Sequence, residues 1–328
     1  MKYRKLGKTG FEISEISLGT WQVGGKWGDL FDHGNADSIL NTAVDAGINF
    51  IDTADVYGDG QSEKAVGRLV KSRKERIIVA TKCGRKLSPH TNEAYNPGVL
   101  KKYVEDSLKN MGLDTIDIIQ LHCPPTQVYY RPEIFSMFDD LKKEGKILHL
   151  GVSVEKVEEA LKAIEYPNVT TVQIIFNLFR QRPTELFFQE AAKKNVGIIV
   201  RVPLASGLLT GKFSGDSKFG RGDHRFFNRM GMFFDRGETF SGINYTTGLE
   251  AVEDLKKIFP GYKNLAPVAL KWILLFKEVS CIIPGASSPD QVLSNLEATE
   301  IPSFTQKQLN EMNAVYEHKI KPLVHHLW

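Results

Sequence analysis

Proton transfer to an oxygen atom is the chemistry that four residues of this sequence could perform together: Asp52, Tyr57, Lys82 and His122. A tyrosine phenol has an ordinary pKa of about 10, too high for ready proton exchange at neutral pH. A nearby ammonium lowers that pKa, and Lys82 is the candidate. A buried lysine needs a carboxylate to keep its charge, and Asp52 is the candidate. His122 can donate a hydrogen bond to a substrate oxygen or share the proton. Such a set suits an oxygen that becomes an alkoxide, as in carbonyl reduction.

Three short apolar segments place these four residues at their ends. The run from Gly47 to Gly58 predicts a buried strand that enters a loop, with Asp52 at the end of the strand and Tyr57 on the loop. The segments 77–82 and 116–122 end in Lys82 and His122 in the same way. We therefore expect the four side chains to meet at one mouth.

The rest of the chain alternates between short apolar runs and stretches with helical spacing. Eight strands are expected, at residues 16–20, 48–52, 77–82, 116–122, 147–152, 169–174, 197–202 and 279–283. Alternation of this kind predicts a parallel sheet, and eight repeats predict a closed (β/α)₈ TIM barrel whose active site lies at the carboxyl ends of the strands. The alternative is an open doubly wound sheet, which would usually carry a Gly-x-Gly-x-x-Gly turn after its first strand; this chain has none.

Three further features complete the expected architecture of a single domain over residues 1–328. Residues 3–14 predict an N-terminal β-hairpin around a Gly-Lys-Thr-Gly turn. A long insertion follows the seventh strand, with residues 213–248 as its probable loop. Residues 300–328 predict a C-terminal tail with one amphipathic helix, ending in His325, His326, Leu327 and Trp328. The insertion's aromatic cluster is either a satellite core or a lid: Phe226, Phe227, Phe233 and Phe234.

Composition excludes several classes of function. The chain has 42 Lys+Arg against 39 Asp+Glu, and it has no basic block, so we expect no nucleic-acid partner. No apolar run reaches 18 residues and the N-terminus lacks a signal region, so we expect a soluble, cytoplasmic protein with no membrane partner. Three cysteines lack metal-ligand or disulfide spacing, which suits free thiols in a reducing compartment and no metal. Cys83 and Cys123 each follow a lumen-facing residue, so we expect both to point toward the helices.

Each of the four residues, taken alone, has a structural interpretation as a cap, a packing side chain or a solvated strand end. Two functional alternatives to a reductase also remain. One treats Lys82 as the Schiff-base lysine of a barrel aldolase, although pairing with Asp52 would keep its amine charged. The other is a non-catalytic binding or regulatory module on the same barrel. Four complementary groups on three consecutive strand ends favour the reductase.

The sequence resembles the aldo-keto reductase family over nearly its whole length, most closely the bacterial, plant and potassium-channel β-subunit branches. The resemblance rests on Gly47-Ile48-Asn49-Phe50-Ile51-Asp52-Thr53-Ala54-Asp55-Val56-Tyr57-Gly58, together with Leu18-Gly19-Thr20-Trp21, Thr81-Lys82, Gln120-Leu121-His122, Gly151-Val152-Ser153, residues 203–212 and Ile283-Pro284-Gly285-Ala286. It implies a barrel without a Rossmann domain. It also implies NADPH-dependent reduction of an aldehyde or ketone, reversible as alcohol oxidation, with NAD(H) not excluded.

The resemblance also assigns roles to residues. Tyr57 becomes the general acid, Lys82 and Asp52 tune it, and His122 orients the carbonyl. Trp21 and Trp27, with Tyr57 and His122, are implied to contact the substrate. The residues implied to bind the cofactor are Gly19, Thr20, Trp21, Ser153, Gln173, Arg201, Pro203, Leu204, Ser206, Gly207, Leu209, Lys212, Gly285, Ser287, Gln291 and Asn295.

The sequence departs from the family pattern in three respects. Val154 stands where an asparagine often contacts the nicotinamide carboxamide, and Arg201 stands where an aromatic residue usually stacks on the ring. A guanidinium can also stack, but its charge should favour the reduced cofactor. Neither Ser287 nor Gln291 is basic, which weakens the expected preference for NADP over NAD. The sequence leaves the physiological substrate and the oligomeric state open.

Overall fold

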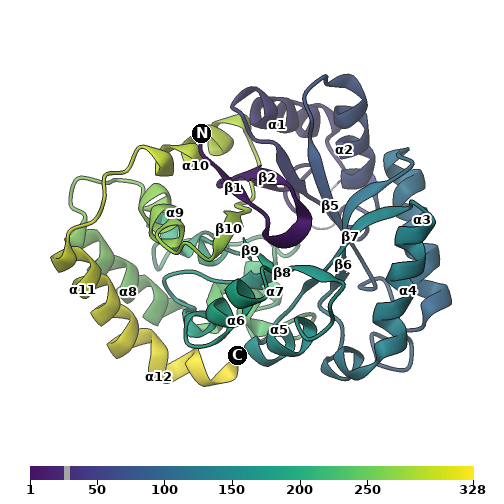
Figure 1. Ribbon diagram of the computed structural model, residues 1–328. Helices are drawn as coiled ribbons and strands as arrows, with labels where there is room; N and C mark the ends of the chain where they lie inside the picture. Colours follow the sequence, from purple (N-terminus) through teal and green to yellow (C-terminus); the bar gives the residue numbers. More distant parts are fainter. Residues whose placement is uncertain (26–29) are drawn as a thin grey trace.

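The computed structural model describes residues 1–25 and 30–328. Its centre is a sheet of eight parallel strands with helices packed around it (Figure 1). Neighbouring strands follow chain order: β3 (Leu18–Gly19), β4 (Phe50–Asp52), β5 (Ile78–Cys83), β6 (Ile116–His122), β7 (Ile147–Ser153), β8 (Val169–Ile175), β9 (Gly197–Arg201) and β10 (Val279–Ile282).

The first and last strands of this sheet meet and close the barrel. Parallel bridges join Ile16 to Ile282 and Gly19 to Gly285. The backbone N–H of Ser17 donates to the carbonyl of Ile282 at 2.9 Å. The predicted (β/α)₈ barrel is therefore confirmed, and the open doubly wound sheet is wrong.

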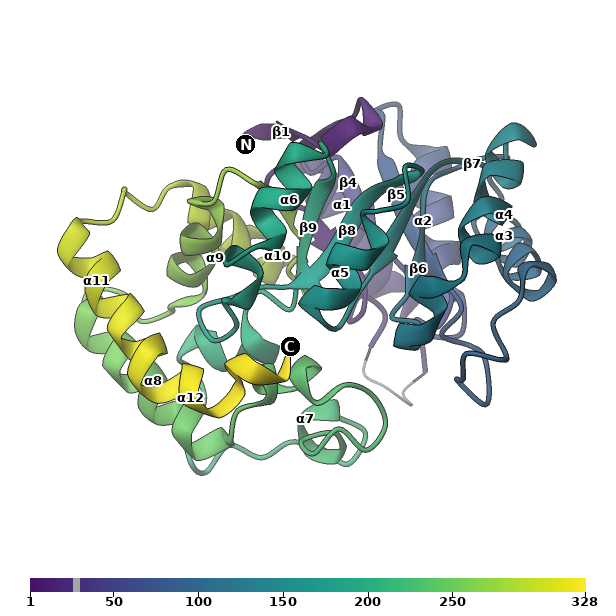
Figure 2. The same cartoon turned by 60° about the horizontal axis from the view of Figure 1, so that its bottom comes forward.

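The predicted N-terminal hairpin, β1 (Tyr3–Lys5) and β2 (Glu12–Ser14), lies across one end of the barrel. Leu6 and Ile13 are fully buried with lumen-facing residues of the strands, including Phe50. Gly7 approaches the barrel so closely that a Cβ there would lie 2.2 Å from the backbone nitrogen of Gly197. The hairpin thus plugs the amino-terminal end of the lumen and leaves the opposite end for the site. Figure 2 shows the hairpin at the top and α7 at the opposite end.

The helices between the strands begin where the sequence offers caps. Asp32, Asn96 and Ser288 each accept a backbone N–H at the start of a helix. The helices around the barrel are α1 (His33–Asp45), α2 (Gln61–Ser72), α3 (Pro97–Met111), α4 (Pro132–Lys143), α5 (Val157–Ala163), α6 (Phe187–Lys193), α9 (Ala266–Leu274) and α10 (Pro289–Leu296). Their apolar faces pack on the outer face of the sheet in one continuous core. None of the helices described is long and apolar enough to cross a membrane.

The insertion after β9 contains one helical turn, α7 (His224–Phe227), and a helix of 14 residues, α8 (Tyr245–Ile258). α8 packs beside α11 (Gln306–Val315), which continues through a π-helical turn into α12 (Lys321–Val324) (Figure 1). The predicted tail therefore holds more helix than the one segment expected. Its last residue packs rather than trailing free, because the Trp328 side chain is 4% exposed.

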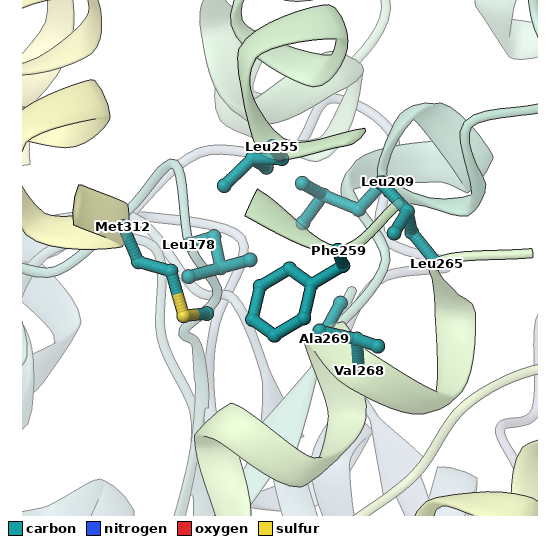
Figure 3. A pocket seen from close by; sticks show the side chains of 8 residues that line it. All are labelled: Leu178, Leu209, Leu255, Phe259, Leu265, Val268, Ala269 and Met312. Atoms are coloured by element: carbon teal, nitrogen blue, oxygen red, sulfur yellow. The ribbon is translucent and has the colours of Figure 1, made fainter. Parts of the chain in front are cut away.

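One small apolar cavity, of about 10 Å³, lies between α8, α9 and α11. Figure 3 shows side chains from all three helices converging on it, among them Leu255, Val268 and Met312. A space of this size holds about one water molecule at most, and apolar walls do not favour one. The cavity is therefore a packing defect of the helical layer and not a substrate site.

Candidate active site

Asp52 and Lys82 form a buried ion pair inside the barrel mouth. They lie at the ends of the adjacent strands β4 and β5, and their side chains are 2% and 1% exposed. The Lys82 ammonium donates to the Asp52 carboxylate, to the carbonyl of Thr53 at 2.8 Å and to the hydroxyl of Tyr57 at 3.3 Å. All three donor hydrogens of the ammonium thus have acceptors.

Two glutamines hold the other oxygen of the Asp52 carboxylate. Gln120 and Gln173 donate their amide N–H groups to Asp52 Oδ2 at 2.9 and 2.8 Å. Gln173 was predicted to contact the nicotinamide, and the structure shows that its amide nitrogen is engaged with Asp52. Sequence reasoning missed Gln120 as a site residue. The available signal was its position two residues before His122, which places both on the same face of β6.

The phenol of Tyr57 reaches this pair from the loop after β4. Burial raises the pKa of Tyr57, and the opposing effect of the Lys82 ammonium is smaller. The expectation that Lys82 lowers this pKa below its ordinary value is therefore wrong for the net shift. For Lys82, burial alone would lower the pKa, but the Asp52 carboxylate and the Tyr57 hydroxyl together raise it. At neutral pH the phenol is protonated and the amine is charged.

His122 faces Tyr57 across the mouth, with ring centroids 6.1 Å apart. Burial lowers the pKa of His122 well below its ordinary value, and the charges of Lys82, Arg85 and Arg201 act in the same direction. The imidazole is neutral at physiological pH. Its Nδ1 atom has no hydrogen-bond partner among the described residues. A neutral imidazole of this kind can donate one hydrogen bond to a carbonyl oxygen.

Aromatic side chains form a wall beside these groups. The rings of Trp21 and Tyr57 lie 5.2 Å apart, and those of Trp21 and Phe234 lie 6.3 Å apart. Phe227 contacts both Phe233 and Phe234, while Phe226 and Phe233 are 55% and 70% exposed. The insertion's aromatic cluster is therefore only partly buried and reaches Trp21 through Phe234. Trp27, predicted to contact the substrate, lies outside the described residues.

Ser153 and Arg201 come together at the ends of β7 and β9. Arg201 spans the mouth, donating to the carbonyl of Val154 at 3.1 Å and lying 3.5 Å from Cys123 Sγ. Cys123 Sγ also lies 3.5 Å from Ser153 Oγ. The prediction that Cys123 points toward the helices is therefore wrong. Its φ of +46° breaks the alternation of the strand. Cys83 packs in the outer core as expected.

The segment after β9 makes a tight turn with left-handed backbone. Ala205, Ser206 and Gly207 have successive positive φ values of 46°, 56° and 90°. Within this turn the N–H groups of Ala205 and Gly207 donate to the carbonyls of Val202 and Leu204 at 3.1 and 2.9 Å. Lys212 follows a few residues later and makes no ion pair among the described residues. Leu204 and Leu209 lie in the same turn, where the N–H of Leu209 donates to the carbonyl of Leu204 at 3.1 Å, and Pro203 precedes them, so the structure brings the residues of this predicted segment together.

The remaining predicted cofactor residues lie where β3 and β10 close the barrel. Gly19 N–H donates to the carbonyl of Pro284 at 3.2 Å, and Gly19 bridges to Gly285. The backbone N–H of Thr20 donates to the carbonyl of Asp52 at 2.9 Å. At the start of α10, Gln291 accepts from both the N–H and the hydroxyl of Ser287, and Asn295 donates to the carbonyl of Gly285 at 3.4 Å. Neither Ser287 nor Gln291 offers a charge to a 2′-phosphate.

A cluster of charged side chains around Arg201 was not predicted from the sequence. Glu238 pairs with Arg201 at 3.3 Å and with Arg85 at 4.0 Å, and Arg85 also pairs with Glu155 at 3.4 Å. Glu155, Glu238 and Cys123 lie close enough together to be grouped as possible metal ligands. The two guanidinium groups already neutralise these glutamates, which disfavours a further cation.

Comparison with known proteins agrees with this geometry. The sequence profile of the Aldo/keto reductase family matches residues 15–317. The chain is 31% identical to the NADH-specific methylglyoxal reductase of Escherichia coli strain K12, over 92% of this chain and 94% of that protein. It is 26% identical to a probable voltage-gated potassium channel subunit beta of Oryza sativa subsp. japonica, over 98% of both chains.

A solved structure supports the same conclusion. The glycerol dehydrogenase AKR11B4 from Gluconobacter oxydans superimposes with a TM-score of 0.78 at 30% identity, over 97% of this chain and 96% of that one. The relatives include oxidoreductases that act on small carbonyl compounds or alcohols, by their names, and the likeness covers nearly the whole chain. The chain therefore belongs to the aldo/keto reductase family.

Proposed function

We propose that this protein is a nicotinamide-dependent reductase that converts an aldehyde or ketone to an alcohol, with Tyr57 as the general acid. One observation carries the proposal. The Lys82 ammonium lies between the Asp52 carboxylate and the Tyr57 hydroxyl at the carboxyl ends of the barrel strands, with Asp52 and Lys82 buried and Tyr57 partly buried. This arrangement provides a proton donor whose conjugate base is stabilised where it forms.

Each of the four residues has a separate role in the proton transfer. In the proposed reduction, Tyr57 donates its phenolic proton to the carbonyl oxygen as that oxygen takes on negative charge. The Lys82 ammonium then stabilises the phenolate, and the Asp52 carboxylate keeps Lys82 charged. His122, which is neutral, donates a hydrogen bond that orients the carbonyl. A reduced nicotinamide, when bound, supplies the hydride that adds to the carbonyl carbon. In the reverse direction the same groups accept the proton of an alcohol.

Cofactor binding is assigned to the residues around this set. Ser153, with the side-chain amide oxygen of Gln173, would hold the nicotinamide carboxamide, and Arg201 would lie against the ring. Residues 203–212 would hold the pyrophosphate, since Lys212 follows this turn and supplies a positive charge that no ion pair among the described residues uses. Residues 285–295 would hold the adenosine end. Trp21 would line the substrate side.

The proposed cofactor is NADP(H), as the family resemblance implies, with NAD(H) as the competing choice. Ser287 and Gln291 are both neutral, and the Escherichia coli relative is NADH-specific by its name. Parallel fluorescence titrations with NADPH and NADH decide between the two. Three buried free cysteines suit a reducing compartment, so we place the reaction in the cytoplasm.

The aldolase alternative is disfavoured by the surroundings of Lys82. Schiff-base formation needs a free amine, whereas Asp52 and Tyr57 raise the pKa of Lys82 and hold its ammonium. Borohydride trapping with a carbonyl substrate tests this alternative directly. A covalent adduct at Lys82 would support the aldolase and contradict the reductase.

The deciding experiment combines binding and turnover. Purified protein is titrated with NADPH and NADH and then assayed for loss of NADPH absorbance with a panel of aldehydes and ketones that includes methylglyoxal. Glycerol with NADP⁺ tests the reverse direction. Tyr57→Phe should bind cofactor with unchanged affinity and lose turnover, whereas the exposed Tyr130→Phe should match the parent. Equal turnover in Tyr57→Phe would overturn the proposal.

A further inference from the structure

Residues 235–242, which we call the clasp, connect the proposed cofactor site to Trp328. On the site side, the clasp contributes Glu238. Its carboxylate pairs with Arg201 at 3.3 Å, and its backbone carbonyl accepts the hydroxyl of Ser206 at 2.7 Å. The N–H of Phe240 returns a hydrogen bond to the same hydroxyl at 3.2 Å. The clasp therefore contacts one residue assigned to the nicotinamide and one assigned to the pyrophosphate.

On its other side, the clasp is held by the indole of Trp328. The indole N–H lies 3.2 and 3.3 Å from the two carboxylate oxygens of Asp235. Asp235 Oδ1 also accepts the backbone N–H of Gly237 at 2.7 Å, which starts the short 3₁₀ helix Arg236–Glu238. One carboxylate thus couples the position of Trp328 to the turn that presents Glu238.

The indole lies directly on the clasp backbone. A Cβ at Gly242, whose φ is +76°, would lie 2.2 Å from the Trp328 ring, and a Cβ at Gly237 would lie 2.9 Å from it. Only glycine allows this approach at both positions. The Trp328 ring is in turn stacked on Arg180, with the guanidinium carbon 4.2 Å from the ring centroid.

Arg180 extends this contact back to the barrel mouth. It is 3% exposed, donates to the backbone carbonyl of Glu155 and lies 3.9 Å from Asp235. Glu155 belongs to the charged cluster around Arg85 described above. Figure 2 shows the yellow end of the chain beside the segment that follows α7, so elements far apart in sequence meet here.

We infer that Trp328 is a positioning residue for cofactor retention. It holds the clasp so that Glu238 stays on Arg201 and Ser206, and the clasp covers the nicotinamide half of the cofactor. Loss of the indole frees Asp235, loosens the turn at 236–238 and lets the cofactor leave faster, because the bound arrangement then requires an ordering step. This inference rests on the proposed function, since it concerns the same cofactor.

The experiment measures release of NADPH by stopped-flow fluorescence in the full chain. Trp328→Ala should raise the dissociation rate about tenfold and raise the KM for NADPH in proportion, without lowering kcat. Trp328→Phe, which keeps the stack on Arg180 and loses the N–H donor, should lie between Trp328→Ala and the parent. The neighbouring Leu327→Ala, at a partly exposed position, is the control and should match the parent.

A second variant and a second measurement separate the possible failures. If Trp328→Ala does not fold, Asp235→Asn weakens the same contact and should raise the release rate in the same direction. Hydrogen exchange without cofactor should show faster exchange of the clasp amides in Trp328→Ala, with the barrel strands unchanged. A parent that binds neither NADPH nor NADH overturns the proposed function and this inference with it. A parent that binds, with release unchanged in the Trp328 and Asp235 variants, overturns this inference alone.

Discussion

The Nζ atom of Lys82 lies 3.3 Å from the hydroxyl oxygen of Tyr57, although the two residues come from the exits of different strands. The same nitrogen is 4.9 Å from the centre of the Tyr57 ring and is paired with Asp52. The ammonium therefore lies beside the phenol and also has a buried counter-charge. The ammonium offsets part of the cost that burial imposes on a negative charge at the phenol oxygen, and the protonated phenol remains the resting form.

Tyr57→Phe should reduce kcat for carbonyl reduction by about 10²–10⁴-fold, because a general acid contributes about that much. Affinity for the cofactor should stay within about twofold, since the phenol is assigned to the substrate side. Steady-state kinetics and fluorescence titration measure the two quantities on one preparation. Tyr130→Phe, at a 64% exposed position, is the matched control. A similar loss of kcat in Tyr130→Phe would show that the effect is not specific to Tyr57.

Removing one member of the buried Asp52–Lys82 pair should destabilise the fold. Asp52→Asn leaves a buried ammonium without its carboxylate and should lower the free energy of unfolding by about 3–5 kcal/mol. Lys82→Met should lower the free energy of unfolding by a similar amount. The double variant should lose clearly less than the sum of the two, because it leaves no unpaired charge. Urea unfolding measures all four proteins, and strict additivity would show that the two groups do not depend on each other.

The folded protein should show no titration of His122 at the ordinary pKa of a histidine, and this absence should make stability depend on pH. Burial and nearby cations keep the pKa of this imidazole well below the unfolded value of about 6.5. Below pH ~6.5 the unfolded chain binds a proton on His122 that the folded chain does not bind. The free energy of unfolding therefore falls as the pH drops below that value, and the full stability is present above it. Urea unfolding from pH 5 to 8 should show this slope in the parent and a smaller slope in His122→Gln. An equal slope in both would contradict the assignment.

The buried carboxyl of Asp55 should give a pH dependence of the opposite sign. Burial, with Glu63 nearby, raises its pKa from 3.8 to about 7. Between these two pKa values the folded chain holds a proton on Asp55 that the unfolded chain has lost. The stability that this proton provides is therefore fully present below pH ~4 and is lost as the pH rises through 7. The free energy of unfolding of Asp55→Asn should therefore rise by about 2–4 kcal/mol relative to that of the parent as the pH goes from 4 to 8. Asp59→Asn, at an exposed position on the same loop, should show no such gain.

Arg201→Tyr should change the balance between oxidised and reduced cofactor. A guanidinium beside the nicotinamide adds positive charge next to a ring that is cationic when oxidised. Replacing the guanidinium should therefore strengthen the binding of NADP⁺ relative to that of NADPH. The shift should be modest, about two- to fivefold, because Glu238 already pairs with Arg201 at 3.3 Å. The ratio of the two dissociation constants is measured against Arg68→Gln as a surface control. An unchanged ratio would remove this role for Arg201.

Local patterns in the sequence determined the barrel and the centre of the site. Each strand is a short apolar run, several of the strands carry a polar residue at or next to their last position, and parallel strands of a closed barrel present those ends at one rim. This periodicity was sufficient to predict that Asp52, Lys82 and His122 would meet, and the loop length brought Tyr57 to them. The segment after β9 was singled out only through the family resemblance, and the left-handed backbone at Ala205 and Ser206 was not predicted.

Only the tertiary structure decided what surrounds that centre. Arg180, Asp235, Glu238 and Trp328 lie on segments that do not share a periodic pattern, and chain folding alone brings them to one side of the mouth. The net pKa of Tyr57 likewise depends on how deeply the phenol is buried, which outweighs the charge beside it. Spacing along a chain specifies which face a residue occupies, whereas burial and long-range pairing depend on how the faces are assembled.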